Sequence, residues 1–417
     1  MNKRKEIHII GGGLYGCLLA YQLLNKKYKV HIFEKSNELV NSFDPIKIDS
    51  ILLNNGFHGI DLPRSNNILN FFKKKLKVKF DIFNIKRKII FQNSLIDYTA
   101  KTSDWPKKIR DQLKINSKNY KNQNFDYFFK KKLISLFKKC SLKYFNNLSE
   151  SKSFFLPWFL PADIKHISSD EGDKFRSLIR KKKIKGNVAL PKKHLFGIIK
   201  KKMLNFLVSQ GAHVHFGTEI KIINDEVRYF SKSRELIFEK KKIKKIFYCL
   251  SSAFLIKDVN IKHFKKIDKF KKFAINCVIK IKDENFDYNF SEILCLNKKI
   301  FFSNRIYPLN FYGYQKKKKG NFLIVEIISK KNFLSEENKI ALVVELQKIF
   351  ELKFRPFICD YKVSRQMYFL EKQWIDESKK ILNRKIKKSL NLSYMNNYQP
   401  LNMNKAWINA LNNSKLR

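Results

Sequence analysis

The sequence of 417 residues predicts an α/β fold in which a domain built on a parallel sheet is interrupted by a helical insertion. A second domain of the α+β type, mostly an antiparallel sheet, is expected to follow. Three observations support this prediction. A strand, a glycine-rich turn, a helix and a strand follow one another in residues 7–34, similar patterns return at residues 195–250, and strand-like apolar runs occupy residues 273–329. Apolar residues make up 44% of the chain, which allows a sizeable core without disulfides.

The first strand and turn carry a dinucleotide-binding pattern. Residues 7–10 are an apolar run with β-branched side chains, which is typical of a buried parallel strand. Gly11, Gly13 and Gly16 then form a G-x-G-x-x-G motif, with Gly12 as an additional glycine. The first glycine of such a motif allows the tight turn, the second lets the backbone approach a pyrophosphate, and the third lets the helix pack against the strand.

A helix and an acidic residue complete the pattern. Apolar residues recur on one helical face at Leu14, Cys17, Leu18, Tyr21 and Leu24. The first amides of this helix, with its positive dipole end, suit phosphate groups, so Leu14 and Tyr15 are included among the predicted binding residues. A second strand, residues 29–33, ends at Glu34, which is followed by Lys35. An acidic side chain at this point accepts hydrogen bonds from a ribose, and it disfavours the 2′-phosphate of NADP.

The nucleotide-binding pattern does not continue directly. Residues 75–185 are polar, basic and aromatic, without alternating strands and helices. Beyond them the sequence predicts a helix over 195–208 that ends at Gly211, then strands over 212–216 and 218–223, a β-ribbon over 226–238, and a buried strand over 245–250. The predicted organisation is a nucleotide-binding domain from residues 1–75, 190–255 and 385–417, a helical insertion or cap over 76–189, and a substrate-binding sheet domain over 256–384.

Four further segments are similar to a known family. They are GFHGIDLPR at 56–64, the helix and strands of HLFGIIKKKMLNFLVSQGAHVHFGTEIKII at 194–223, IFYCLSS at 246–252, and YQPLNMNKAWINAL at 398–411. Together with the opening turn, they resemble the FAD-dependent superfamily that includes amine oxidases, protoporphyrinogen oxidase and UDP-galactopyranose mutase. In that family these segments are a turn near the flavin, an adenine-contacting strand, a strand end of the "ILATP" type, and a late helix.

The resemblance implies FAD as the cofactor. It places Gly59 in the flavin-adjacent turn, Ile220 at the adenine, and Asn397 beside the flavin ribityl chain. Asn396 and Asn397 stand where the family usually has Gly-Asp or Gly-Arg, although an Asn side chain can both donate and accept hydrogen bonds there. The usual R-x-GG flavin-contact run is absent. His58 is the one histidine that the resemblance places near the chemistry.

A substrate region is predicted in the second domain, whose sheet lies over the flavin in the family. The segment 301–315 gathers Arg305, Tyr307, Tyr312 and Tyr314. Arginine suits a bidentate contact with phosphate or carboxylate, and tyrosine supplies a flat wall with a polar tip. The alternative is an ordinary surface strand that carries these residues by chance.

The composition limits the partners. A net charge of +51 attracts nucleic acid, anionic lipid or anionic metabolites, but Lys, Asn, Ile, Phe and Tyr are over-represented together, which indicates a compositional bias. Arginine is sparse, so no specific nucleic-acid partner is predicted, whereas peripheral contact with an anionic membrane stays open. Six scattered cysteines fit a reducing, cytoplasmic compartment. No apolar run reaches the length of a spanning helix.

No metal site is expected from the sequence. His8 and His31 lie in predicted core strands, where they are interpreted as structural residues. His213 and His215 alternate on one predicted strand without a nearby Cys or carboxylate partner in the sequence.

The leading hypothesis is an FAD-dependent oxidoreductase acting on a small molecule, with an anionic substrate as one option, in which the flavin performs the chemistry. A mutase-like flavoenzyme acting on a nucleotide sugar is the alternative within the same fold. A degenerate flavoprotein fold that serves as a binding protein, and a charge-driven binder of nucleic acid or membrane, are the alternatives of other classes.

Overall fold

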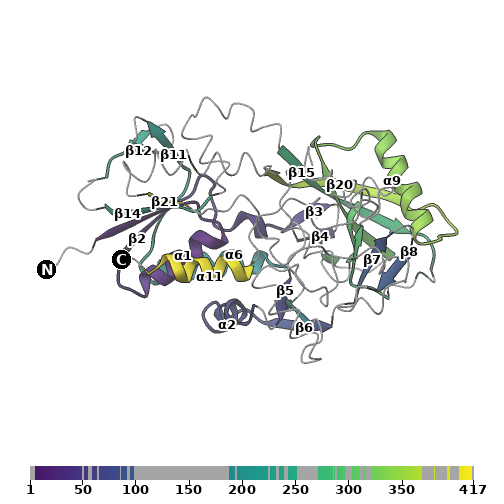
Figure 1. Cartoon of the computed structure of the whole chain (residues 1–417), viewed down its shortest axis with the longest axis horizontal. Helices are drawn as coiled ribbons and strands as arrows, with labels where there is room; N and C mark the ends of the chain where they lie inside the picture. Colours follow the sequence, from purple (N-terminus) through teal and green to yellow (C-terminus); the bar gives the residue numbers. More distant parts are fainter. Residues whose placement is uncertain are drawn as a thin grey trace.

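The structure is a computed structural model of the whole chain. It describes residues 5–48, 51–54, 59–62, 65–84, 86–91, 94–97, 187–192, 195–223, 226–231, 234–238, 243–250, 271–284, 286, 289–295, 303–309, 313–315, 321–368, 380, 392–394 and 403–415. The fold is mixed α/β, with a parallel sheet and its helices at one end of the molecule and a larger, mostly antiparallel sheet with helix α9 at the other (Figure 1).

The parallel sheet has five strands in the order β10-β2-β1-β14-β21. Their bounds are β1 Glu6–Ile10, β2 Lys29–Phe33, β10 His213–His215, β14 Ile243–Tyr248 and β21 Leu392–Tyr394. All four pairings are parallel. The strand order reverses at β1, which is the point where doubly wound sheets bind their ligands.

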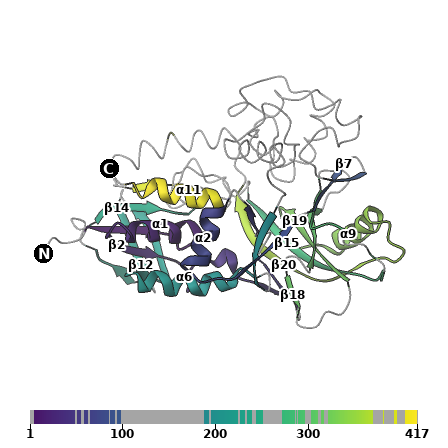
Figure 2. The same cartoon turned by 90° about the horizontal axis from the view of Figure 1, so that it is seen from below.

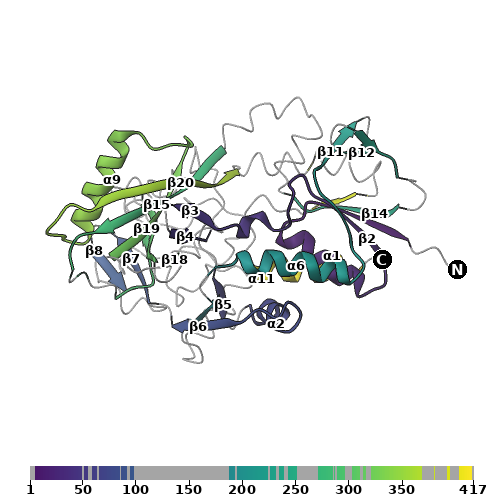
Figure 3. The ribbon, with the colours of Figure 1, turned by 180° about the vertical axis from the view of Figure 1, so that it is seen from behind.

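Helices and a β-ribbon cover the two faces of this sheet. Figures 2 and 3 show α1 (Leu14–Leu24), α6 (Gly197–Ser209) and α11 (Met403–Asn413) lying together on one side. The strands β11 (Thr218–Ile223), β12 (Glu226–Ser231) and β13 (Arg234–Leu236) form a three-stranded antiparallel ribbon. Ile7 and Ile9 of β1 pack in one core with Leu18 of α1, whereas His8 contacts Tyr229 of β12, so the ribbon covers the opposite face.

The larger sheet has seven strands in the order β20-β15-β19-β17-β16-β7-β8. Their bounds are β7 Arg87–Phe91, β8 Ser94–Asp97, β15 Lys271–Ile281, β16 Glu292–Cys295, β17 Ser303–Pro308, β19 Asn321–Ser329 and β20 Phe357–Tyr368. Strands β16 and β7 pair in parallel, and the other pairs are antiparallel. Helix α9 (Glu336–Ile349) is N-capped by Ser335, whose side chain accepts a hydrogen bond from the Asn338 amide.

Small elements join the two sheets. The remaining elements are η1 Asn41–Phe43, β3 Ile46–Ile48, β4 Ile51–Leu53, β5 Ile60–Leu62, α2 Asn66–Lys74, β6 Phe80–Asn84, β9 Asn187–Pro191 and β18 Gly313–Gln315. The strands among them form two three-stranded sheets, β18-β4-β3 and β5-β9-β6. None of the helices in the described part of the chain has the length and apolar character to span a bilayer.

The two faces of the larger sheet belong to different cores. Val278, Tyr307 and Ile324 pack in the core that contains α1 and the parallel sheet. Their neighbours on the same strands, Cys277 and Ile306 among them, pack in a second core with α9. Because side chains alternate along a strand, one face of the larger sheet faces the core shared with the parallel sheet, and the other face packs against α9.

The predicted fold class is confirmed, and the predicted strand over 218–223 coincides with β11. The described parts of the expected helical insertion differ from the prediction, because residues 80–84, 87–91 and 94–97 are strands. β6 pairs with β9, β7 pairs with β16, and β8 pairs with β7. Most of that insertion lies outside the described residues. The exact domain bounds stay a prediction.

Candidate functional site

The turn after β1 has the geometry that its glycines predict. Gly11 has a φ of +99°, and its amide donates to the Phe33 carbonyl over 2.8 Å, which ties the turn to the end of β2. A Cβ on Gly16 would lie 2.0 Å from the Gly11 carbonyl oxygen. The first glycine therefore provides a left-handed conformation, and the third allows α1 to pack directly on the turn.

Gly13 is different, because it faces open space. It is exposed, and a Cβ placed on it would meet no atom within 4 Å. It is the N-cap residue of α1, which has no side-chain cap and no acidic residue in its first turn. The amides of Leu14 and Tyr15 thus begin a helix whose own first turn carries no negative charge. This arrangement fits a pyrophosphate, which needs backbone amides and close approach.

Glu34 is fixed beside the turn at the end of β2. Its Oε2 accepts a hydrogen bond from the Gly12 amide over 2.7 Å. Its Oε1 accepts hydrogen bonds from the Ser36 amide and hydroxyl, over 2.9 and 2.8 Å. Each carboxylate oxygen can accept two hydrogen bonds, so Oε2 keeps capacity for a ribose hydroxyl.

Lys35 and Ile220 lie next to Glu34 on neighbouring elements. The Lys35 ammonium contacts Glu219 Oε1 at 3.0 Å, and both side chains are exposed. The amide of Thr218, at the start of β11, donates to the Glu34 carbonyl over 3.0 Å. Ile220 follows two residues later on the same strand, with its side chain buried. The structure therefore brings the glycine turn, Glu34, Lys35 and Ile220 to one edge of the parallel sheet.

The Tyr15 side chain packs in the core and does not face open space. Its ring is buried, and its hydroxyl oxygen accepts a hydrogen bond from Asn413 Nδ2 of α11 over 2.6 Å. Burial raises the pKa of this phenol, so it stays protonated. Only the backbone of Tyr15 is therefore available to a ligand at the turn.

Several predicted residues lie outside the described chain. They are His58, Tyr312, Asn396 and Asn397. Gly59 is described, half-buried, directly before β5. The backbone of Tyr314 lies in β18, which pairs with β4.

Arg305 lies on the same face of the larger sheet as Tyr307, the face that shares a core with the parallel sheet. It is directly opposite Glu326 of β19, and its Nε is 3.9 Å from Glu326 Oε1. Its Nη1 is 3.6 Å from Oε1 of Glu292 on β16. Both carboxylates are almost fully buried, so two acids neutralise this one guanidinium. Tyr307, two residues further along β17, is buried in the core.

Two polar residues extend this row on β15. Asn276 is opposite Glu326 and fully buried, and neither its Oδ1 nor its Nδ2 has a hydrogen-bond partner in the described structure. Lys272 lies four residues before it on the same face, also buried. Burial, together with the charge of Lys330, lowers the Lys272 pKa to about 8. Buried polar groups are normally paired, and unpaired ones mark strain, water or a ligand site.

The motifs in the sequence did not single out Asn276, Glu292, Glu326 and Lys272. The sequence does carry a signal for two of them, since Asn276 and Glu326 each interrupt a mostly apolar stretch of a strand. A polar residue in the middle of such a strand is costly unless it is paired or functional. The row that they form with Arg305 could not be read locally, because it spans four strands.

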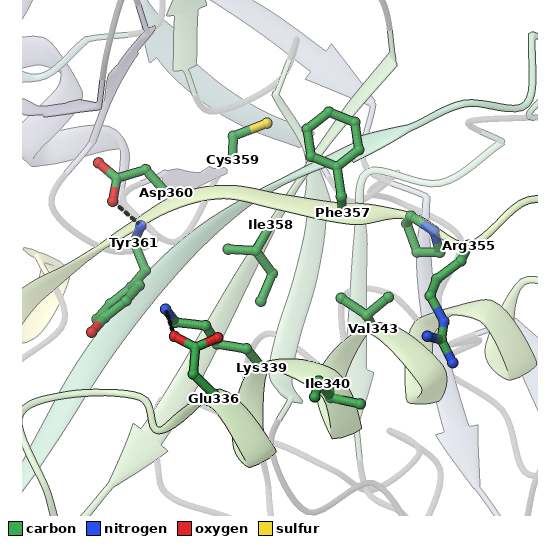
Figure 4. Close-up of a pocket in the computed structure, with 11 residues that line it drawn as sticks. Glu336, Lys339, Ile340, Val343, Arg355, Phe357, Ile358, Cys359, Asp360 and Tyr361 are labelled. Carbon is green, nitrogen blue, oxygen red and sulfur yellow. Dashed lines mark hydrogen bonds and ion pairs between the residues drawn. The ribbon is translucent and has the colours of Figure 1, made fainter.

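A surface pocket of about 420 Å³ lies elsewhere, between α9 and β20. Figure 4 shows its lining side chains on the outer face of the larger sheet. Lys339 is paired with Glu336 at 2.6 Å, and the Asp360 carboxylate accepts from the Tyr361 amide. None of the predicted site residues lines this pocket, so it is not part of the arrangement around the glycine turn.

Comparison with known proteins shows the same fold. The family model for an NAD(P)-binding Rossmann-like domain matches residues 9–74. A crystal structure described as a candidate protoporphyrinogen oxidase, from Exiguobacterium sp. 255-15, aligns over 99% of this chain and 98% of its own, with a TM-score of 0.66 and 11% identity. Reduced UDP-galactopyranose mutase aligns over 98% and 94%, with a TM-score of 0.68 and 12% identity.

Two further solved structures, of proteins with other functions, are also similar to this chain in fold. Putrescine oxidase aligns over 99% of this chain and 98% of its own, with a TM-score of 0.58 and 10% identity. A fatty acid isomerase from P. acnes has the same coverage, with a TM-score of 0.60 and 8% identity. No curated protein matches the chain in sequence. The resemblance drawn from the motifs is thereby confirmed at the level of the fold: the chain has a Rossmann-like domain, and its fold is similar over nearly its whole length to those of UDP-galactopyranose mutase and putrescine oxidase.

Proposed function

We propose that this protein is an FAD-dependent enzyme that performs flavin-mediated redox chemistry on a small molecule. One observation carries the proposal: Gly13 presents open space in front of the uncapped start of α1, with Glu34 fixed at the adjacent strand end. This combination suits the pyrophosphate and the adenosine ribose of one dinucleotide.

The residues of the chain would divide the work of binding. The turn from Gly11 to Gly16 holds the pyrophosphate, and Glu34 accepts from the ribose hydroxyls. Ile220 would contribute backbone contacts to the adenine, and Gly59 would lie along the flavin part, whereas the role of Asn397, outside the described residues, stays a prediction. Bound FAD supplies the electron-accepting chemistry, whereas the chain positions the substrate and excludes water.

The polar row on the larger sheet is the proposed substrate face. Asn276 offers an unpaired donor and an unpaired acceptor, and Lys272 a proton that is held less tightly than usual. Because Arg305 is matched by Glu292 and Glu326, it does not present a net positive charge. We therefore favour recognition of the substrate through hydrogen bonds, with Arg305 and Tyr314 as further candidate contacts. Arg305→Ala should then reduce substrate turnover.

The test begins with the visible absorption spectrum of the purified protein and of the supernatant after denaturation. Flavin bands, with free FAD released, support the proposal. Gly13→Asp should abolish FAD binding because its carboxylate would occupy the space of the pyrophosphate, while the far-ultraviolet circular dichroism stays that of the wild type. A colourless wild type that cannot be reconstituted with FAD would instead favour a non-catalytic binding protein.

A mutase that acts on a nucleotide sugar is the second candidate, favoured by the likeness to reduced UDP-galactopyranose mutase along nearly the full length of both chains. The two functions differ in electron balance. An oxidoreductase consumes one equivalent of an electron acceptor for each product, whereas a mutase turns over without net redox change. Anaerobic turnover of a nucleotide sugar by the reduced protein would identify the mutase.

A further inference from the structure

Three neighbouring strands of the parallel sheet place histidines side by side. His8 of β1 pairs in register with His31 of β2, which pairs with His213 of β10. Glu6 lies two residues before His8 and is opposite Lys29. Side chains two residues apart share a face, so Glu6, His8 and His31 project from the same side of the sheet, toward the β11-β12-β13 ribbon.

Three ligand-type atoms converge there. One atom each of Glu6, His8 and His31 lies within 4.8 Å of the other two, and His8 Nε2 is 3.8 Å from Glu6 Oε2. That distance is too long for a hydrogen bond. All three residues are buried, with exposed fractions of 8%, 0% and 6%. In the described structure, the Nε2 atoms of both histidines have no hydrogen-bond partner.

The other polar atoms of these side chains are already held. His8 Nδ1 is 2.8 Å from the Tyr229 hydroxyl, and His31 Nδ1 is 3.0 Å from His215 Nε2. Glu6 Oε1 accepts from the Lys29 ammonium over 2.8 Å. Each imidazole thus has one nitrogen held by a neighbour and the other buried without a hydrogen-bond partner in the described structure. This is how metal-binding histidines are oriented in proteins, with the second nitrogen donating to an outer partner.

Aromatic rings pack around the two imidazoles. Phe33, Phe238 and Tyr229 each contact the His8 ring. Lys29, the partner of Glu6, is half-exposed, so solvent screens its charge.

We propose that Glu6 Oε2, His8 Nε2 and His31 Nε2 bind a divalent transition-metal ion, with Zn²⁺ the best fit. Two imidazoles and one carboxylate are a common zinc set, and a water completes the tetrahedron. Zinc at its usual bond lengths holds ligand atoms about 3.4 Å apart, so small side-chain rotations close the site. Cross-strand register, and not sequence proximity, brings these ligands together. The ion would tie β1 to β2 on the face away from the glycine turn.

The test is metal binding to the untagged protein. The purified chain is treated with a chelator, dialysed, and then equilibrated with Zn²⁺, and bound zinc is measured by mass spectrometry. One zinc ion per chain is expected, and zinc should raise the melting temperature. X-ray absorption at the zinc edge should show imidazole nitrogen and carboxylate oxygen. These measurements need neither FAD nor activity, so they are independent of the proposed function.

Variants decide whether the bound zinc is at this site. Glu6→Gln and His8→Gln should each lower the zinc affinity at least tenfold. His213→Gln removes an exposed histidine that stacks on His31 without being a ligand, and it should bind zinc as the wild type does. If His8→Gln fails to fold, the zinc affinity of Glu6→Gln, which changes the first residue of β1, tests the site by itself. Absence of stoichiometric zinc in the folded wild type, or undiminished affinity in folded Glu6→Gln, overturns the proposal.

Discussion

The Gly12 amide donates to Oε2 of Glu34 over 2.7 Å, which joins the glycine turn to the end of the neighbouring strand. The same carboxylate thus organises the turn and faces the predicted ribose. Its loss is expected to disturb ligand binding more than the stability of the fold, since the turn keeps its backbone bond from Gly11 to Phe33.

Glu34→Gln should weaken FAD binding by roughly tenfold to a hundredfold, because a hydrogen bond to a charged group contributes about 1.5–3 kcal/mol. Reconstitution titrations of the apoprotein measure this change. Glu219→Gln is the matched control, because it removes an exposed carboxylate that pairs with Lys35. Equal effects of the two variants would assign Glu34 no special role.

Gly16→Ala and Gly13→Ala should separate packing from ligand approach. A Cβ at Gly16 would overlap the Gly11 carbonyl oxygen, so we expect the free energy of unfolding to fall by about 3 kcal/mol. A Cβ at Gly13 meets nothing, so its cost should stay at or below about 1 kcal/mol. Urea denaturation compares them, and similar losses for both would contradict the geometry of the turn.

Asn276→Leu should stabilise the protein while it impairs turnover. Removing an unpaired buried amide is expected to raise the free energy of unfolding by about 1–2 kcal/mol. If Asn276 contacts the substrate, kcat/KM should fall at least tenfold. Cys277→Ala is the control on the α9 face, where it should reduce stability and leave kcat/KM unchanged. Unchanged kcat/KM in Asn276→Leu would make the amide purely structural.

Lys272→Met should stabilise the protein in a pH-dependent way. The folded pKa of Lys272, about 8, lies below the ordinary value of 10.5, so the unfolded chain holds this proton more tightly. Stability is therefore lost as the pH falls through this range, and at pH 7 the buried charge costs about 3 kcal/mol. The gain in Lys272→Met, measured by urea denaturation, should be largest at pH 7 and small near pH 10.

Lys271→Met provides the comparison for that experiment. Lys271 is the adjacent residue on the other face of β15, half-buried over the Phe273 ring. Its replacement should change stability little at either pH. A gain for Lys272→Met that is the same at pH 7 and pH 10 would show that the lysine is not a strained buried charge.

The elements that local patterns predict best are those with a clear period or a turn signal. The glycine turn, Glu34 and the strand over 218–223 follow from spacing alone. The carboxylates around Arg305 did not, because Glu292 and Glu326 reach it from separate strands through register. Likewise, Glu6 and His31 are distant in sequence and meet only across the pairing of β1 with β2.

The strands within the expected insertion were harder to predict from the sequence for the same reason. The stretch before residue 98 is rich in lysine and aromatic residues, and its strands are stabilised by partners far along the chain, β16 and β9. A sequence window contains none of these partners, so the strand character there is a tertiary effect.

The strand order also bears on how the chain reaches its native state on the ribosome. β1 and β2 are synthesised first, but the far edge of their sheet is completed only by β21, near residue 394. β7 likewise has no parallel partner until β16 has been made, some two hundred residues later. A nascent chain must therefore carry open strand edges for most of its translation, and such edges aggregate readily. Its yield in a foreign host should depend on translation speed and chaperone supply more than on the stability of the finished fold.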